Sequence, residues 1–352
     1  MMNETSVKLL AEVSQKIGIS GDEKNVSRYL NERYKDVCDE IVYDNLGSIF
    51  AVKRCGKENA KRVMVCAHMD EVGFLIKEIH ENGLLSFIKI GSCLDQALYG
   101  AKVRVKTNDQ EYAGVIVANE DDATNPGVKT LRIDLGATSK CEVMDMGVRL
   151  GDSAVLDGAF TVLAQNRYSG KALDSRSGCA LGVELLEAVK DCTFDFDLYV
   201  GASVMEEVGQ RGGTTATGMI HPDMGIVLHG GAANDINGKG NDVGQLGKGV
   251  LVRYYDKGMM PNRGLLEELV STCKANAINY QYYYSMTTTD SAWVHKLFAG
   301  CPTLTVGICA RNVQSANVII DGHDYNCAKD ALIAIVKGLN VDKLQQFKES
   351  NR

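Results

Sequence analysis

The sequence predicts an α/β fold in which a mixed sheet, flanked by helices, is interrupted by a small all-β domain. Apolar runs of strand length alternate with helical patterns over residues 1–72 and again over residues 166–352. Residues 73–165 differ, because they carry short strand patterns separated by turn residues. At 352 residues, the chain is also longer than a typical domain built around a single hydrophobic core. We therefore expect one α/β domain in two parts, 1–72 and 166–352, around an inserted β-barrel-like domain, 73–165.

The first α/β part begins with two amphipathic helices. Apolar residues at positions 7, 10, 11 and 17 share one helical face, which ends near Gly18, and a second helix starts near Gly21. Strand patterns follow at residues 40–43, 48–53 and 62–67. The last of these is an apolar run of the kind found in a buried strand, and it ends at His68.

The inserted region contains the strongest hairpin signal in the chain. Asn82 and Gly83 separate two strand patterns, at residues 74–79 and 84–90, and this dipeptide favours a tight hairpin turn. Further strand patterns occupy residues 102–106, 112–118, 130–134 and 153–156. No helix of useful length is predicted between residues 73 and 165.

Helices and strands alternate again after residue 166. A helix follows Asp174, and a β-prone run over residues 198–204 stops at the adjacent carboxylates Glu206 and Glu207. A short apolar strand over residues 225–228 ends at His229. The remaining predicted elements are a helix around 266–273, a strand at 281–284, a short helix around 293–298, a strand at 303–308 and a closing helix at 328–339.

Composition and charge argue against a nucleic-acid-binding, membrane or secreted protein. The net charge is −7 and no run of Lys and Arg stands out, which argues against a nucleic-acid footprint or a basic membrane-binding patch. No apolar run approaches the roughly 18 residues of a membrane span. The 11 cysteines are scattered without a C-x-x-C pair, and the N-terminus is too polar for a secretory signal. We expect a cytoplasmic protein with free thiols.

Potential metal ligands stand at the ends of several predicted strands. His68 and His229 follow two strands, Glu207 follows a third, and Asp174 precedes a helix. Imidazole and carboxylate together suit zinc, cobalt or manganese. Asp70 could fix the tautomer of His68 by accepting a hydrogen bond from it. Where two carboxylates are adjacent, one can hold a metal while the other handles a proton.

Three ordered segments resemble the motifs of the tetrahedral, or TET-type, metallo-aminopeptidases. This family includes glutamyl and deblocking aminopeptidases, and some members have been labelled endoglucanases. The segments are 67–74 (AHMDEVGF), 170–179 (GKALDSRSGC) and 206–213 (EEVGQRGG). Residues 151–152, 246–249 and 289–290 are also similar, and the resemblance extends from the first helix to about residue 340.

The resemblance implies a co-catalytic, two-metal aminopeptidase that removes N-terminal residues from short peptides. Asp174 would bridge two divalent ions (Zn, Co or Mn), with His68 on one and Glu207 on the other. Glu206 would be the general base that takes a proton from a metal-bound water. The α/β part would be the catalytic domain, and the inserted domain would form dimers that assemble into a dodecamer.

Two positions depart from the family pattern. His229 stands where the family has an aspartate ligand, and Gln314 stands where it has a histidine ligand. We expect His68, Asp174 and His229 to hold one metal, whereas Asp174, Glu207 and Gln314 form a site that is weak or empty. Two alternatives are open: His323 could replace Gln314 through a loop shift, and Asp235 could replace His229.

Two other function classes compete with the aminopeptidase. A family member that has lost catalysis could act as a binding or assembly protein, because two expected ligands are replaced. A glycoside hydrolase is less favoured, because glycosidases need two carboxyl groups about 5–10 Å apart on either side of a sugar. Adjacent residues such as Glu206 and Glu207 would point to opposite sides of a strand. The low aromatic content of 7% also leaves little material for stacking against sugars.

Overall fold

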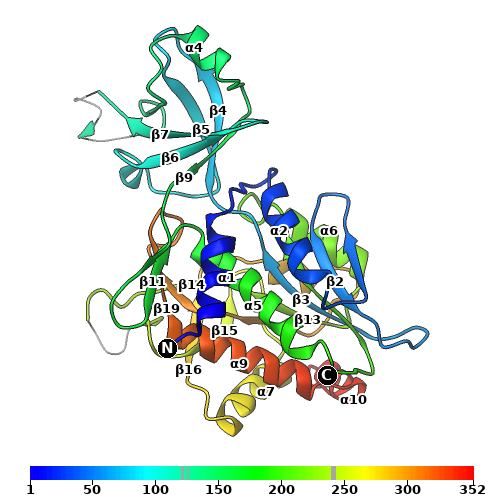
Figure 1. The fold of residues 1–352 in the computed structure, drawn as a ribbon. Coiled ribbons are helices and arrows are strands. Elements are labelled where there is room, and N and C mark those ends of the chain that lie inside the picture. The colour runs from blue at the N-terminus through cyan, green and yellow to red at the C-terminus, as the bar shows by residue number, and fades with distance from the viewer. Residues whose placement is uncertain (120–122, 125–126, 239–242) are drawn as a thin grey trace.

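The computed structural model describes residues 1–352 except 120–122, 125–126 and 239–242. The α/β part and a separate β-barrel are clearly distinguished in Figure 1. The mixed α/β fold predicted from the sequence is confirmed. Among the described residues, no helix is both long and apolar enough to cross a membrane.

A six-stranded sheet forms the centre of the α/β part, in the order β1-β2-β12-β3-β13-β17. Its strands are β1 (Glu40–Tyr43), β2 (Ile49–Lys53), β3 (Arg62–His68), β12 (Asp197–Ser203), β13 (Met224–Leu228) and β17 (Thr303–Val306). β12, β3, β13 and β17 run parallel, whereas β2 is antiparallel to both of its neighbours. The carboxyl ends of the four parallel strands therefore meet at one edge, which is where open α/β sheets bind ligands.

Helices cover both faces of this sheet. On one face, α5 (Leu173–Val189) packs between α1 (Glu4–Gln15) and α9 (Gly322–Gly338), as Figure 1 shows. On the other face, α6 (Arg211–Ile220) and α8 (Ser291–Val294) bury a smaller cluster around Phe50, Met64 and Tyr199. The other helices of the α/β part are α2 (Lys24–Tyr34), α7 (Arg263–Ala275) and α10 (Val341–Glu349). The sheet is thus sandwiched between two apolar layers.

Two small sheets lie beside the central one, and the sequence predicted only one of their strands, at residues 281–284. A five-stranded sheet has the order β10-β11-β19-β18-β14, and β15 pairs with β16. Their strands are β10 (Thr161–Val162), β11 (Arg167–Gly170), β14 (Gly231–Ala232), β18 (Cys309–Arg311), β19 (Val318–Asp321), β15 (Val250–Asp256) and β16 (Tyr280–Ser285). The strands of the five-stranded sheet have only two to four residues, which is too short for a periodicity that a sequence window can detect.

The inserted region forms a closed barrel in the order β4-β5-β8-β7-β6-β9. The strands are β4 (Gly73–Ile79), β5 (Leu85–Ile90), β6 (Lys102–Lys106), β7 (Glu111–Val117), β8 (Arg132–Asp134) and β9 (Ser153–Leu156), with a 3₁₀ turn η1 (Asp95–Ala97). The predicted Asn82-Gly83 hairpin joins β4 to β5. Closure removes the exposed sheet edges that an open sheet would leave.

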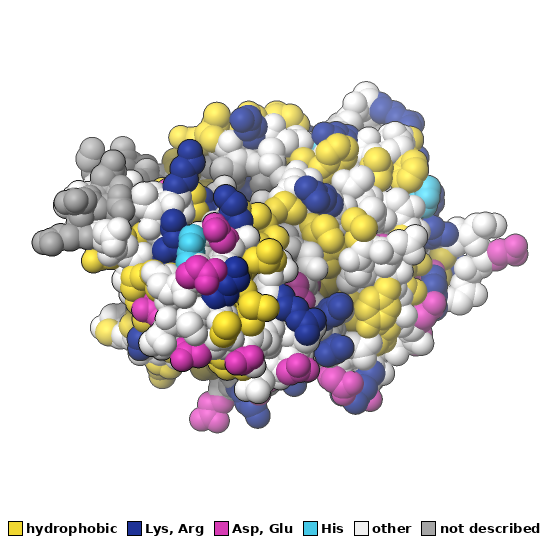
Figure 2. Space-filling model, turned by 90° about the horizontal axis from the view of Figure 1, so that it is seen from above, with side chains coloured by type: hydrophobic (Ala, Val, Ile, Leu, Met, Phe, Trp, Pro, Cys, Tyr) yellow, Lys and Arg dark blue, Asp and Glu magenta, His cyan; other side chains and the backbone are white. Residues whose placement is uncertain are grey.

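A short helix in this region, α4 (Lys140–Asp145), was not predicted. Six residues are too few for a helical period, but the N-cap residue Ser139 marks its start. The hydroxyl of Ser139 accepts a hydrogen bond from the Glu142 amide, and the Glu142 carboxylate accepts one from the Thr138 amide. Figure 2 views the molecule from the barrel side, where basic, acidic and hydrophobic side chains are interspersed.

A buried ionic network fastens the segment after β3 to helices α1 and α5. Both carboxylate oxygens of Glu71 accept hydrogen bonds from the Lys171 ammonium, at 2.7 and 2.9 Å. Arg176 lies 3.4 Å from the same carboxylate and donates to the backbone oxygens of Val13 and Gly18. Burial lowers the pKa of Lys171 to about 8, although the Glu71 charge opposes this shift. The network therefore fixes the chain beside His68.

Replacing Glu71 should destabilise the fold strongly. Glu71→Gln keeps the side-chain shape but leaves two buried cations without their anion, so we expect a loss of about 3–5 kcal/mol in the free energy of unfolding. Denaturant unfolding followed by circular dichroism measures this loss. Glu267→Gln, which removes an exposed ion pair with Arg263, is the matched control and should leave the midpoint unchanged. Equal midpoints for the two variants would show that the network contributes little.

Candidate metal centre

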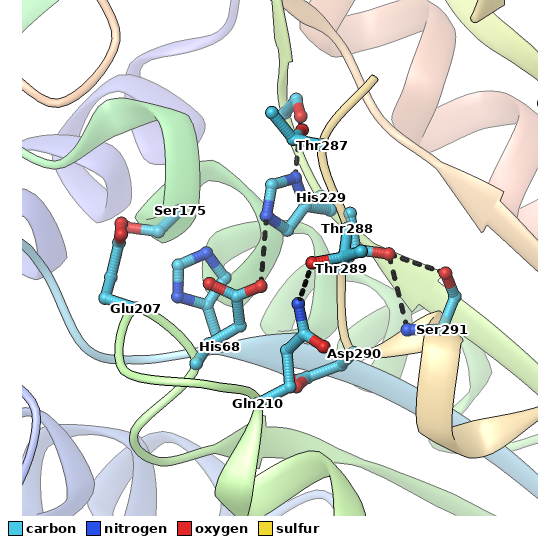
Figure 3. Close-up of polar contacts among 12 residues, drawn as sticks. His68, Ser175, Glu207, Gln210, His229, Thr287, Thr288, Thr289, Asp290 and Ser291 are labelled. Carbon is cyan, nitrogen blue, oxygen red and sulfur yellow. Dashed lines mark hydrogen bonds and ion pairs between the residues drawn. The ribbon is translucent and has the colours of Figure 1, made fainter. Parts of the chain in front are cut away.

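The sheet topology brings three polar side chains together at the carboxyl edge of the central sheet. His68 is the last residue of β3, His229 follows β13, and Glu206 lies in the loop after β12. Their ligand atoms all lie within 4.8 Å of one another. The two imidazole rings are stacked with centroids 5.0 Å apart, and His229 Nε2 is 3.9 Å from Glu206 Oε1. Figure 3 shows both rings beside the same space, with Glu207 on one side and Thr287–Thr289 on the other.

Two imidazoles and a carboxylate fit a divalent ion such as zinc, cobalt or manganese. Each ring has its other nitrogen engaged, as metal-binding histidines usually do. His68 Nδ1 donates to Asp70 Oδ1 at 3.3 Å, and His229 Nδ1 donates to the Gly230 oxygen at 2.7 Å. Because both acceptors lack a proton to donate, the contact places a proton on Nδ1 of each ring, and Nε2 is the nitrogen that faces the site and can bind a metal when the ring is neutral.

Asp70 connects this histidine to the loop that carries the two glutamates. Its Oδ1 accepts the backbone N–H of Glu206 at 3.0 Å, and its Oδ2 accepts that of Glu207 at 3.0 Å and the hydroxyl of Ser20 at 2.7 Å. Burial alone would raise the pKa of Asp70, but the hydrogen bond from His68 keeps it below its usual range. Asp70 is fully buried and therefore acts through its neighbours.

The site concentrates buried negative charge. Burial raises the pKa of Glu206 well above its usual range, with His68 opposing the shift and Asp290 and Glu207 adding to it. Burial likewise raises the pKa of Glu207 to about 7. Although burial lowers the pKa of His68, Glu206 and Asp70 outweigh it and raise the value to about 10. A cation is therefore electrostatically favoured between these side chains.

His229 has the opposite electrostatic environment. Burial lowers its pKa well below the usual range, and the charges of His68 and Arg253 lower it further. The ring is consequently neutral, which is the form that binds metals.

Asp174, Glu207 and Gln314 form a second group beside the first. Asp174 Oδ2 accepts the backbone N–H of Gln314 at 2.9 Å, and Glu207 Oε2 accepts the Gln314 side-chain amide at 3.3 Å. Gln314 adopts a left-handed backbone conformation, with φ of 59°. The backbone N–H of Gln314 thus donates to Asp174 and its side-chain amide donates to Glu207. Asp174 and Glu207 are not part of the three-residue group of His68, Glu206 and His229.

Both groups open into one cleft of about 690 Å³. That volume is typical of a small-molecule site. Besides the residues above, its walls include Gln210, Val243, Lys257, Tyr283, Tyr284, Met286, Thr287 and Thr288. The side chain of Gln210 donates to the Thr288 hydroxyl, which joins the loop after β12 to the loop after β16.

The two alternative ligands predicted from the sequence lie elsewhere. Asp235 receives two hydrogen bonds from Arg311, at 2.7 and 2.8 Å, and one from the Leu246 amide. His323 is the second residue of α9 (Gly322–Gly338), and its ring lies 3.5 Å from the Cys327 sulfur. Neither side chain lines the cleft.

Sequence reasoning missed a buried carboxylate behind the site. Asp290 accepts a hydrogen bond from the hydroxyl of Ser203 at the end of β12, and burial raises the pKa of Asp290 to about 6. Gly213 lies against it, since a Cβ there would be 2.4 Å from Asp290 Oδ1. The Thr289-Asp290 pair within the family-like pattern was the signal that could have identified it.

Comparisons with known proteins agree with this fold. The chain is 30% identical to glutamyl aminopeptidase of Lactococcus lactis over 353 residues, covering 97% of this chain and 98% of the relative. A TET aminopeptidase from a marine sediment archaeon of the Thaumarchaeota superposes with a TM-score of 0.92 at 30% identity, covering 98% and 100% of the two chains. The TET1 peptidase of Pyrococcus horikoshii, which can assemble into a tetrahedron or a large octahedral shell, gives a TM-score of 0.83 at 27% identity, covering 95% and 100%.

The resemblance inferred from three short segments is therefore confirmed over most of the chain. Residues 47–330 match the model of the M42 glutamyl aminopeptidase family. With motifs, fold and family model in agreement, the chain belongs to the M42 glutamyl aminopeptidase family and is a metal-dependent aminopeptidase.

Proposed function

We propose that this aminopeptidase removes the N-terminal residue of short peptides in the cleft at the carboxyl edge of the central sheet. The convergence of His68, Glu206 and His229 on one space, within a cleft of small-molecule size, is the observation that supports this most directly. Adjacent to it, Glu207 and Asp174 supply further carboxylate oxygens.

We assign the strong metal site to His68 and His229, completed by a carboxylate. Although Asp174 lies outside the three-residue group, it lines the same cleft, and we assign that carboxylate to Asp174 so that Glu206 stays available for proton transfer. A bound divalent ion would polarise the scissile carbonyl and make a water molecule more acidic. Asp70 acts as a positioning residue, since it orients His68 while holding the backbone of Glu206 and Glu207.

Glu206 is the proposed general base. Its carboxylate is nearly buried, lines the cleft and lies next to the space between His68 and His229, where it could reach a water held by a bound ion. It takes a proton from the attacking water and returns that proton to the leaving amine. Because its backbone is fixed by Asp70, little reorganisation is needed to place the carboxylate.

The second site, around Asp174, Glu207 and Gln314, is weaker in this proposal. A neutral amide is a poorer ligand for zinc than an imidazole, and the Gln314 amide already donates to Glu207. Manganese or magnesium, which prefer oxygen ligands, would suit it better than zinc.

We further propose that residues 73–165 form a dimerisation domain in a homo-oligomeric enzyme. Support comes from exposed apolar side chains on this domain, including Leu94, Tyr99 and Leu150, and from the assembly of the related Pyrococcus horikoshii peptidase. Eleven unpaired cysteines favour a reducing, cytoplasmic location.

Glu206→Gln tests the general base. The variant should retain the metal content of the wild type but hydrolyse aminoacyl-anilides about 10²–10⁴ times more slowly, because no carboxylate accepts the proton. A chelator should abolish the wild-type activity. His323→Gln, outside the cleft, is the control and should keep both metal and turnover.

Each outcome of that experiment has a separate meaning. Normal turnover of Glu206→Gln would overturn the base assignment. Loss of metal would instead make Glu206 a ligand, and absence of chelator-sensitive hydrolysis in the wild type would favour a binding or assembly role.

Gln314→His tests the occupancy of the second site. Histidine tolerates the left-handed backbone at this position and supplies the ligand that glutamine lacks. Elemental analysis after zinc titration should show about one ion per chain in the wild type and about two in the variant. Gln314→Leu, which offers no ligand, should match the wild type. Two zinc ions in the wild type would show that the second site is complete without histidine.

A further inference from the structure

One backbone carbonyl joins a proposed metal ligand to a buried arginine. The Gly230 oxygen accepts hydrogen bonds from His229 Nδ1 at 2.7 Å and from Arg253 Nη2 at 2.9 Å. The N–H of the same residue donates to the Asp174 backbone oxygen at 3.2 Å. A Cβ on Gly230 would lie 2.6 Å from that oxygen, so the close approach requires glycine.

The position of this carbonyl decides which ring nitrogen of His229 is available. A carbonyl oxygen only accepts hydrogen bonds, so a short contact with Nδ1 requires the proton to be on Nδ1. The lone pair of the neutral ring then resides on Nε2, which lies on the side of Glu206. If the carbonyl turned away, Nδ1 would lose its partner and the ring would be free to change tautomer or rotate.

Arg253 is held rigidly on the other side of the carbonyl. Its side chain is 1% exposed, its Nη1 lies 3.3 Å from Asp256 Oδ2, and its guanidinium stacks 5.3 Å from the ring centre of Tyr283. Asp256 in turn accepts a hydrogen bond from the Thr289 hydroxyl at 3.1 Å. The planar guanidinium therefore contacts both the Asp256 carboxylate in β15 and the Gly230 carbonyl in the loop after β13. The compact ammonium of a lysine could not bridge these two groups equally well.

We infer that Arg253 is a positioning residue that holds the Gly230 carbonyl and, through it, keeps His229 in the tautomer and orientation that present Nε2 to the metal site. This inference rests on the proposed function, because it assumes that His229 binds metal. Hydrogen-bonded partners of this kind typically change metal affinity 10–100-fold when they are removed.

Cobalt binding to metal-free enzyme in its native assembly tests the inference. Arg253→Lys keeps a cation beside Asp256 but cannot hold Asp256 and Gly230 together, and Arg253→Met/Asp256→Asn removes both charges at once. We expect each variant to bind Co²⁺ about 10–100 times more weakly than the wild type and to change the visible absorption bands of the bound ion.

Tyr112→Phe is the control. It removes a hydrogen bond to the Met146 oxygen within the barrel, away from the cleft, and should bind Co²⁺ with the wild-type affinity and spectrum. A purely structural role for Arg253 would lower the melting temperature of the two Arg253 variants without changing their Co²⁺ spectrum or affinity.

The outcomes separate the inference from the proposed function. Wild-type Co²⁺ affinity and spectrum in folded Arg253→Lys would overturn the inference. The same result in the folded double variant would also overturn it. Failure of the wild type itself to bind Co²⁺ would instead remove the metal site on which the proposed function depends.

Discussion

The site depends on one buried carboxylate that satisfies donors from three separate parts of the chain. Asp70 accepts hydrogen bonds from its near neighbour His68, from Ser20 at the N-terminal end of the fold, and from the backbone of Glu206 and Glu207 after β12. A buried carboxylate without such partners would be costly, so its presence requires these segments to stay together. The histidine orientation and the glutamate positions are therefore set by the same group.

The sequence predicted those features that follow from strand ends. Parallel strands place their carboxyl ends at one edge, so His68 and His229 could be expected to be neighbours before any coordinates were known. The barrel was likewise visible as a series of short strands and turns. The five-stranded sheet was not, because its strands are short and pair residues as distant in sequence as Arg167 and Asp321.

Other details required the three-dimensional structure. The sequence offered Asp235 as a possible ligand, but only the fold reveals that Arg311 engages its carboxylate. Gln314 has a left-handed backbone that directs its N–H at Asp174, and a glutamine in a sequence does not indicate this conformation. Arg253 carried no motif, and its contact with Gly230 arises from the packing of β15 beside the loop after β13. Such contacts join segments that are distant in the sequence, and no local sequence pattern specifies how these segments align.

The attachment of the barrel has a mechanical consequence. β4 begins at Gly73, immediately after the segment that carries His68, Asp70 and Glu71, and β9, which pairs with β4, returns the chain to the α/β part. Asp22, two residues from Ser20, also forms an ion pair with Lys106 of the barrel at 2.7 Å. Restraining the barrel against a neighbouring subunit would thus reduce the thermal motion of the segment that carries His68. If the barrel forms a dimer interface as proposed, part of the conformational entropy otherwise lost when a cation binds would already be lost on assembly, and assembly would then strengthen metal binding.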